Sequence, residues 1–424
     1  MPTSTPNNPL DAADGHIGDH IPGRGERGHS GRTVFIFSSL AHFYIHLCIA
    51  FYFVIVLSLE RSWDLPYHEL VSLWTLGSLM VGVCALPAGM IADRFGAPRM
   101  MMLFFLGLGG CAIGAGLSTG ESSLFWWLTG IGVFAAIYHP VGIPWLVRNI
   151  PGKRGKALAL NGIFGSFGGA AAGLATGFLI DVINWRAAFI VPGVIVVLTG
   201  VAMIMVSRLG GTLEREVSSH SHSTAEHPAL GIFALLMFSM FISGLLFNGT
   251  QTALPKYFEL RGQSLIGDSV FGIGVLVACV YTLAGFMQIL GGHLADRYPL
   301  KTVYMSAIAL QIPFLWLAAQ FDGWMLMVTC TLMVVANTGA LPAENMILAR
   351  FAPSNRHGLA FGAKFVLSFG AAPVAVLLVS YIQDRTGDLS LLFRLYSGIA
   401  IVAVAVVMLL PSLPRMSALA SRST

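Results

Sequence analysis

The stretch Gly89-Met-Ile-Ala-Asp93-Arg94-Phe-Gly96-Ala-Pro-Arg99 is a short charged interruption between two long apolar segments. It recurs as Gly292-His-Leu-Ala-Asp296-Arg297-Tyr-Pro-Leu-Lys301, with the glycine, alanine, aspartate, arginine and a trailing cation in order. The glycines that open the two copies are 203 residues apart. A duplicated charged hairpin in an apolar chain indicates two related halves.

The composition around this motif is that of a membrane protein. Of 424 residues, 55% are hydrophobic and only 10% are charged, whereas a soluble domain carries about 25% charged residues. A membrane-spanning helix needs about 20 mostly apolar residues, so the apolar runs leave room for about twelve. We therefore predict an all-α integral membrane protein. The five cysteines are odd in number and lie in apolar segments, so no disulfide framework is expected.

The spans divide into two halves. We expect a disordered cytoplasmic tail over 1–32, a six-helix half over 33–207, a cytoplasmic linker over 208–229, a second six-helix half over 230–411 and a cytoplasmic tail over 412–424. The predicted helices run over 33–59, 68–92, 98–118, 124–147, 157–181, 187–207, 230–255, 269–294, 301–320, 324–348, 358–382 and 391–411.

The placement of cations predicts the orientation. If the N-terminus is cytoplasmic, the cytoplasmic connections hold about twice as many Arg and Lys residues as the opposite ones. Cytoplasmic loops carry this excess, so both termini are expected on the cytoplasmic side. The expected location is the inner membrane of a bacterium. Because each half has an even number of helices, the halves insert with the same orientation, as parallel repeats that enclose a cavity near the midplane.

The repeat extends well beyond the opening motif. Pro140, Arg148 and the run Ser166-Phe-Gly168 are matched 202 residues later by Pro342, Arg350 and Ser368-Phe-Gly370. With these residues the chain resembles the major facilitator superfamily from about Thr33 to Pro411. The pair Tyr138-His139 before Pro140, followed by Lys153-Arg154-Gly155 and a glycine-rich fifth helix, is similar to the fosmidomycin-resistance-type exporters and related bacterial carriers. The resemblance implies two six-helix halves that alternate access to a site between them.

The charged hairpins are candidates for a conformational switch. An aspartate near a helix end can face the positive N-terminus of another helix, and an arginine can bind its carboxylate. The resemblance assigns this role to the loop; anchoring of helix ends in the lipid headgroups is the alternative. The candidate switch residues are Gly89, Asp93, Arg94, Gly96, Arg99, Gly292, Asp296 and Arg297.

Two charged residues lie inside predicted helices. Glu344 is six residues before Arg350, and Lys364 is eight residues after Arg356. At about 1.5 Å per residue, both lie roughly 9 to 12 Å into the membrane from the cytoplasmic side. Charges there are costly and therefore suggest function. Lys364 could anchor an anionic substrate while Glu344 accepts a proton or acts as counter-ion; a structural ion pair is the alternative.

Three histidines are further candidates. His42 and His46 are four residues apart and share one face of the first helix, and His139 precedes Pro140 in the fourth. They could pack, relay protons or bind substrate. Because no cysteine or carboxylate obviously completes a metal shell, no metal site is predicted. The other histidine-rich stretches, in the tail and the linker, are interpreted as solvated.

Neutral polar side chains complete the candidate site. Asn161, Asn248, Gln251 and Asn345 are expected to contact substrate, although each could instead hold helices together. The glycines of the fifth helix, between 162 and 173, would permit close approach of the two halves.

The predicted function is secondary active transport of a small organic solute. We predict an anionic solute in preference to others because Lys364 is the only cation deep in the predicted spans. Coupling to protons is also expected. A drug or metabolite exporter exchanging against protons is one alternative, and a sensor or scaffold is another. No nucleotide-binding loop or metalloprotease motif is present, so we expect neither enzyme activity nor a cofactor. The expected partners are lipid, substrate and protons but no nucleic acid, and the expected state is a monomer.

Overall fold

The computed structural model describes residues 24–150, 154–209, 230–351 and 357–411. These residues form helices and short connections, with no β-strand among them. The expected tail over 1–32 lies mostly outside the described residues, as do most of the linker and the C-terminal tail. The first helix begins at Arg24, before the predicted start at residue 33.

The N-terminal half contains six spans. Spans one, two and four are interrupted, and the others are single helices. Their elements are α1 (Arg24–Ala50) with α2 (Tyr52–Trp63), α3 (Tyr67–Ser72) with α4 (Trp74–Val83) and α5 (Ala85–Phe95), α6 (Ala97–Gly116), α7 (Glu121–Ala135) with the π-helical turn η1 (Tyr138–Gly142) and α8 (Ile143–Asn149), α9 (Arg154–Val182) and α10 (Trp185–Arg208).

The C-terminal half contains six more spans, each a single helix. They are α11 (Leu230–Arg261), α13 (Val270–Arg297), α14 (Leu300–Ala318), α15 (Gly323–Phe351), α16 (His357–Thr386) and α17 (Ser390–Leu409), with the short α12 (Gln263–Ile266) between the first two. Eleven helices are long and apolar enough to cross a membrane, and the pair bent by 46° at Cys84 makes a twelfth span within the described ranges. The all-α prediction with twelve spans is therefore confirmed.

The surface of the helix bundle is apolar. Large side chains such as Leu198 of α10, Trp324 of α15 and Met408 of α17 are mostly exposed. A soluble protein rarely exposes so much contiguous apolar surface. This surface is suited to lipid, as predicted.

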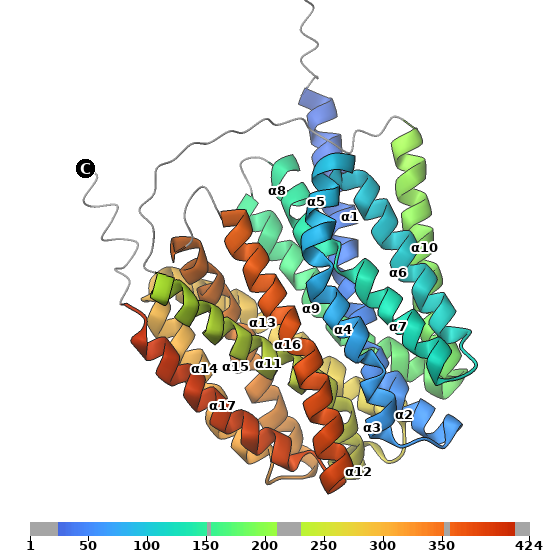
Figure 1. Ribbon diagram of the computed structural model, residues 1–424, viewed down its shortest axis with the longest axis vertical. Helices are drawn as coiled ribbons and strands as arrows, with labels where there is room; N and C mark the ends of the chain where they lie inside the picture. The colour runs from blue at the N-terminus through green and yellow to red at the C-terminus, as the bar shows by residue number, and fades with distance from the viewer. Residues whose placement is uncertain (1–23, 151–153, 210–229, 352–356, 412–424) are drawn as a thin grey trace, which may run out of the picture.

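The two halves lie side by side, with α9 against α13 and α4 against α16 (Figure 1). Glycines let α9 and α13 approach closely. A Cβ atom on Gly173 would lie 2.7 Å from the carbonyl oxygen of Gly274, and one on Gly177 would lie 2.7 Å from that of Val270. Both contacts are shorter than real Cβ atoms show. The helix-five glycines thus permit backbone contact between the halves.

The opening motif is mostly helix. Gly89, Asp93 and Arg94 lie within α5, and the turn is confined to Gly96, whose φ of 85° is a conformation that favours glycine. In the second copy, Gly292, Asp296 and Arg297 lie in the last turns of α13. The sequence motif therefore marks two helix ends rather than two charged loops.

Candidate transport site

Histidines gather in the core of the N-terminal half. His42 and His46 lie on one face of α1, and His139 lies in the π-helical turn η1. Pro140 has no backbone N–H to donate, and a π turn accommodates one extra residue in the helix. The turn re-aims His139 toward α1: its ring centroid lies 5.6 Å from that of His42 and 5.8 Å from that of His46.

Asn161 of α9 holds the first ring of this group. The Nδ1 atom of His42 lies 2.7 Å from the Asn161 carbonyl oxygen and 2.9 Å from its Oδ1. Because a carbonyl oxygen only accepts, Nδ1 carries the proton and Nε2 keeps its lone pair. The hydroxyl of Tyr138 also donates to Asn161 Oδ1, over 2.9 Å. Asn161 is thus a positioning residue for His42.

The other two rings are not held by hydrogen bonds to described residues. One nitrogen from each of His42, His46 and His139 lies within 4.8 Å of those of the other two. The His139 ring also packs on Phe365 and Phe369 of α16, each at 5.0 Å between centroids. The group, named here the histidine cluster, therefore faces the opposite half of the molecule.

Asn248 and Gln251 lie about a helix turn apart on α11 and line a pocket between the halves. The Asn248 amide donates to the carbonyl oxygens of Gly244 and Ser368, at 2.7 and 3.1 Å. The remaining walls are mostly apolar: Ile49, Phe53, Trp74, Ser78, Val81, Thr252, Phe369, Ala372 and Val376. An apolar pocket with few polar groups is typical of small-molecule sites.

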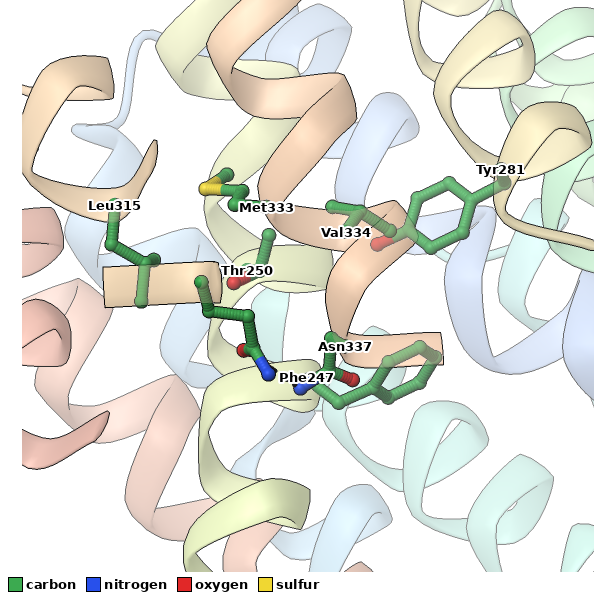
Figure 2. A pocket seen from close by; sticks show the side chains of 8 residues that line it. Phe247, Thr250, Tyr281, Leu315, Met333, Val334 and Asn337 are labelled. Carbon is green, nitrogen blue, oxygen red and sulfur yellow. Dashed lines mark hydrogen bonds between the residues drawn. The ribbon is translucent and has the colours of Figure 1, made fainter. Parts of the chain in front are cut away.

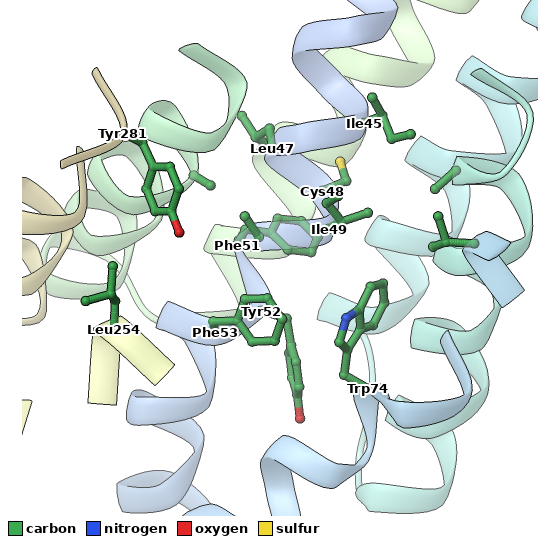
Figure 3. Packing of buried hydrophobic residues seen from close by; sticks show 14 of the residues in the cluster. Ile45, Leu47, Cys48, Ile49, Phe51, Tyr52, Phe53, Trp74, Leu254 and Tyr281 are labelled. Carbon is green, nitrogen blue, oxygen red and sulfur yellow. The ribbon is translucent and has the colours of Figure 1, made fainter. Parts of the chain in front are cut away.

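A second, smaller hollow lies within the C-terminal half (Figure 2). Asn337 of α15 donates to Gln311 Oε1 of α14 over 3.1 Å, and Thr250 and Tyr281 line the same space. Three residues that line the inter-half pocket, Ile49, Phe53 and Trp74, belong to the packed hydrophobic core drawn in Figure 3. Of these two pockets, the inter-half pocket is the one whose lining comes from both halves.

Glu344 and Lys364 meet inside the C-terminal half. Lys364 Nζ lies 2.6 Å from Glu344 Oε1, and both side chains are almost fully buried. The hydroxyl of Tyr304, on α14, donates to the other carboxylate oxygen over 3.1 Å. Lys364 also donates to Asn345 Oδ1 over 2.5 Å. Asn345 therefore contacts the ion pair.

The candidate switch residues make few contacts with charged partners. Among the described residues, neither Asp93 nor Arg94, nor Asp296 nor Arg297, forms an ion pair. Arg99 donates to the carbonyl oxygen of Phe95, one turn earlier. These helix ends lie at the end of the molecule where α5 and α8 are found (Figure 1).

The opposite end is closed by ion pairs between the halves. Lys256 Nζ of α11 lies 2.6 Å from Glu60 Oε2 of α2, and Arg61 lies 2.8 Å from Glu259. His68 of α3 lies 3.5 Å from Asp384 of α16. Among the described residues, every ion pair of a Lys, Arg or His that joins the two halves lies at this end.

Comparison with known proteins places the chain in a family. The model described as Major Facilitator Superfamily matches residues 38–367 and 236–423. The chain belongs to the major facilitator superfamily. It is thus a secondary transporter and not an enzyme, as predicted, and the lipid bilayer and a small-molecule substrate are its partners.

Several solved superfamily structures share the fold. A bacterial homologue of the human lysosomal transporter Spinster, inward-facing and unoccupied, has a TM-score of 0.65 at 15% identity over 92% of this chain and 95% of that one. A D-xylose–proton symporter scores 0.70 at 13% identity over 91% and 98%. A mutant of the peptide transporter POT in complex with sulfate scores 0.71 at 14% identity over 93% and 94%. At these identities the likeness shows the fold alone.

One relative resembles the chain more closely in sequence. The puromycin resistance protein pur8 of Streptomyces alboniger is 35% identical over 129 residues, or 29% of this chain. The match spans 25% of that protein's own length.

Sequence reasoning missed two parts of the site. Tyr304 was not a candidate, although a tyrosine at the start of α14 is a polar group near the membrane-embedded charges. Glu60 and Lys256 fall just beyond the predicted helices over 33–59 and 230–255, yet they lie inside α2 and α11. Opposite charges within the last turns of the first and seventh spans were the signal that could have found this inter-half contact.

Proposed function

We propose that this transporter couples the movement of a small organic solute, preferably an anion, to protons. It would work as a monomer in the cytoplasmic membrane of a bacterium, with both termini inside. Access would alternate by rocking of the two halves around the inter-half pocket and the histidine cluster.

The buried pair of Glu344 and Lys364 is the observation that carries this proposal. At 2.6 Å, with Tyr304 on the second carboxylate oxygen, each charge compensates the other. A proton that binds to a Glu344 oxygen removes the negative charge, and the Lys364 ammonium loses its counter-ion. An uncompensated buried cation is costly, so an anionic solute entering with the proton would restore neutrality.

The ends of the molecule support alternating access. The ion pairs at Glu60 and Arg61 hold one end together, while the candidate switch residues at the other end form no ion pair with described side chains. Opening the closed end would require breaking these pairs. The switch motif would then form its contacts at the other end, which is the role the family resemblance implies.

A proton-driven exporter remains the second candidate. It is favoured by the partial match to a puromycin resistance protein and by the resemblance of the fourth and fifth helices to exporters. Such a carrier of neutral or cationic compounds would depend on Glu344 more than on Lys364.

A ligand screen followed by vesicle transport tests the proposal. Purified protein is heated with carboxylates, sugars and puromycin across a range of pH, because specific ligands stabilise by mass action. Each stabilising compound is then assayed in proteoliposomes under an imposed pH gradient. We expect a carboxylate to accumulate, and a protonophore to abolish accumulation.

Variants separate the roles of the two charges. Lys364→Ala should abolish binding of the carboxylate, and Lys364→Arg should keep part of it. Glu344→Gln should keep exchange of solute but lose its response to the pH gradient. Recovery of gradient-driven transport in the Glu344→Gln/Lys364→Ala double variant would show that the pair is only structural. Puromycin transport that needs Glu344 but not Lys364 would favour the exporter.

A further inference from the structure

We propose that His42, His46 and His139 form a binding site for a divalent transition-metal ion such as Zn²⁺, Co²⁺ or Ni²⁺. The spacing of His42 and His46 is typical of metal ligands, but no metal site was predicted because no cysteine or carboxylate completes a shell in the sequence. The π-helical turn supplies the third ligand from a different span. Imidazole nitrogens are favoured ligands of these ions.

The geometry suits three-histidine coordination. One nitrogen of each ring lies within 4.8 Å of those of the others. Around an ion with bonds of about 2.0 to 2.1 Å, tetrahedral ligands lie about 3.3 Å apart. Side-chain rotation closes the difference, because the His46 and His139 rings have no hydrogen-bond partner among the described residues.

Asn161 orients His42 and fixes its tautomer for binding a metal ion. A metal-bound histidine usually donates its second N–H to a carbonyl or carboxylate oxygen, which fixes the tautomer. His42 makes this contact: Nδ1 lies 2.7 Å from the Asn161 carbonyl oxygen, which leaves Nε2 for the ion. The space beside Nε2 depends on Gly165, where a Cβ atom would lie 2.7 Å from this nitrogen.

The site leaves a fourth coordination position open. Three protein ligands with an open position characterise sites that bind exchangeable ligands, whereas closed sites have four. All three ligands are neutral imidazoles, surrounded by Tyr138, Phe365 and Phe369. A divalent ion in these apolar surroundings is expected to take an anion as its fourth ligand, such as hydroxide or the carboxylate of a chelating solute.

Metal titration of the full-length protein tests the site. The chain is purified with an affinity tag that contains no histidine, treated with EDTA and titrated with Co²⁺, whose visible spectrum reports tetrahedral nitrogen coordination. We expect one equivalent with this spectrum. A variant in which His16, His20, His29, His220, His222 and His227 are replaced by Ala should retain it, which excludes the tail and linker histidines as its source.

Substitutions in the cluster should remove this equivalent. His42→Ala/His46→Ala/His139→Ala should lose it. His46→Gln alone should weaken binding by at least about 100-fold, because loss of a mere outer-shell partner already costs about 10- to 100-fold. Gly165→Ala should weaken binding by crowding Nε2. Gly162→Ala, on the same helix, is its matched control, because its Cβ atom would meet only Gln288 at 3.9 Å.

Two results would overturn the proposal. One is a triple variant, or a His46→Gln protein with unchanged melting temperature, that binds Co²⁺ as tightly as the wild type. The other is a six-coordinate Co²⁺ spectrum in the variant without tail and linker histidines. Both measurements are independent of transport, so the metal site and proton coupling at Glu344 can fail separately.

Discussion

The two halves of the transporter use their charged residues differently. In the C-terminal half, several charges pair internally, such as Glu344 with Lys364 and Arg261 with Asp388, while others reach the N-terminal half. In the N-terminal half, the described ion pairs shorter than 4.0 Å all reach across to the other half, through Glu60, Arg61 and His68. Its polar centre, the partly buried histidine cluster, contains no carboxylate.

This difference shows how far the halves have diverged from their common pattern. The positions 202 residues before Glu344 and Lys364 are occupied by Gly142 and Gly162. The scaffold prolines and arginines are repeated, but the charged pair is not. The C-terminal half thus carries a buried ion pair of its own. The N-terminal half instead carries the uncharged histidine cluster and contributes charged residues to the closed end.

The largest expected effect is on stability, from breaking the internal pair. Lys364→Ala leaves the Glu344 carboxylate buried without a counter-ion, which costs about 3–5 kcal/mol in measured cases. His46→Ala leaves no uncompensated charge and should cost less. Thermal unfolding in detergent would measure both. Because neutral Glu344→Gln removes the stranded charge, adding it to Lys364→Ala should recover most of the loss; equal melting temperatures for Lys364→Ala and wild type would contradict this account.

The next effect should change conformation. Lys256→Met removes the cation that binds both Glu60 and Glu259, at 2.6 and 2.7 Å. Charge-assisted hydrogen bonds of this kind contribute about 1.5–3 kcal/mol. The closed end should open more often, so hydrogen exchange of the amides in α2 and α3 should accelerate while those of α15 stay unchanged.

Arg61→Ala is the control for this change. The Arg61 side chain is 51% exposed, and exposed pairs contribute about 0–1 kcal/mol. Its effect on exchange should therefore be smaller than that of Lys256→Met. Equal acceleration in the two variants would show that burial of Lys256 does not determine closure.

A third effect concerns the backbone contact between the halves. Gly173→Ala places a Cβ atom 2.7 Å from the Gly274 carbonyl oxygen, whereas Gly169→Ala, one turn earlier, meets only the Tyr281 ring at 4.0 Å. Overpacking typically costs about 1–3 kcal/mol. Gly173→Ala should lower the melting temperature and speed exchange in α13 near Gly274. Gly169→Ala should do neither, and a matching loss there would indicate a general intolerance of α9 to alanine.

Much of the fold could be predicted because apolar length alone determines a membrane span. The predicted and observed spans from residue 68 onward begin within about three residues of each other at most helices. The similar membrane depth of Glu344 and Lys364 also followed from sequence, since each lies a similar number of residues from an arginine expected at the membrane surface. Whether the two residues pair was left open. The depth of a residue in the membrane can be counted from the end of its helix in the sequence.

The contacts around the site could not be predicted because they depend on lateral packing. Tyr304 reaches Glu344 from another span, and the sequence does not say which helices adjoin. His139, which joins His42 and His46, lies in a π turn that the sequence pattern does not announce. The pairs at Glu60 and Lys256 depend in addition on which end of the transporter is closed.

The smallest expected effect concerns an ion pair that stays inside the C-terminal half, outside the membrane spans. Burial raises the pKa of the Asp388 carboxyl, but hydrogen bonds from Arg261, Ser390 and the Leu389 amide outweigh it and lower that pKa to about 2. Because the folded pKa lies below the unfolded one, near 3.9, Asp388 stabilises the fold above about pH 4 and loses this contribution as pH falls toward 2.

Asp388→Asn tests this sign. The variant should melt slightly below wild type at neutral pH, and the difference should shrink as the pH falls from 5 to 2, in thermal unfolding followed across that range. Asp322→Asn is the control, because Asp322 is 67% exposed and its contact with the same arginine is more screened by solvent. A difference for Asp388→Asn that grows at low pH would reverse the assignment and show that burial, not Arg261, dominates this carboxylate. Arg261 would then not compensate the charge of Asp388. Glu344 and Lys364 would be the one pair that still distinguishes the C-terminal half from the N-terminal half in this comparison.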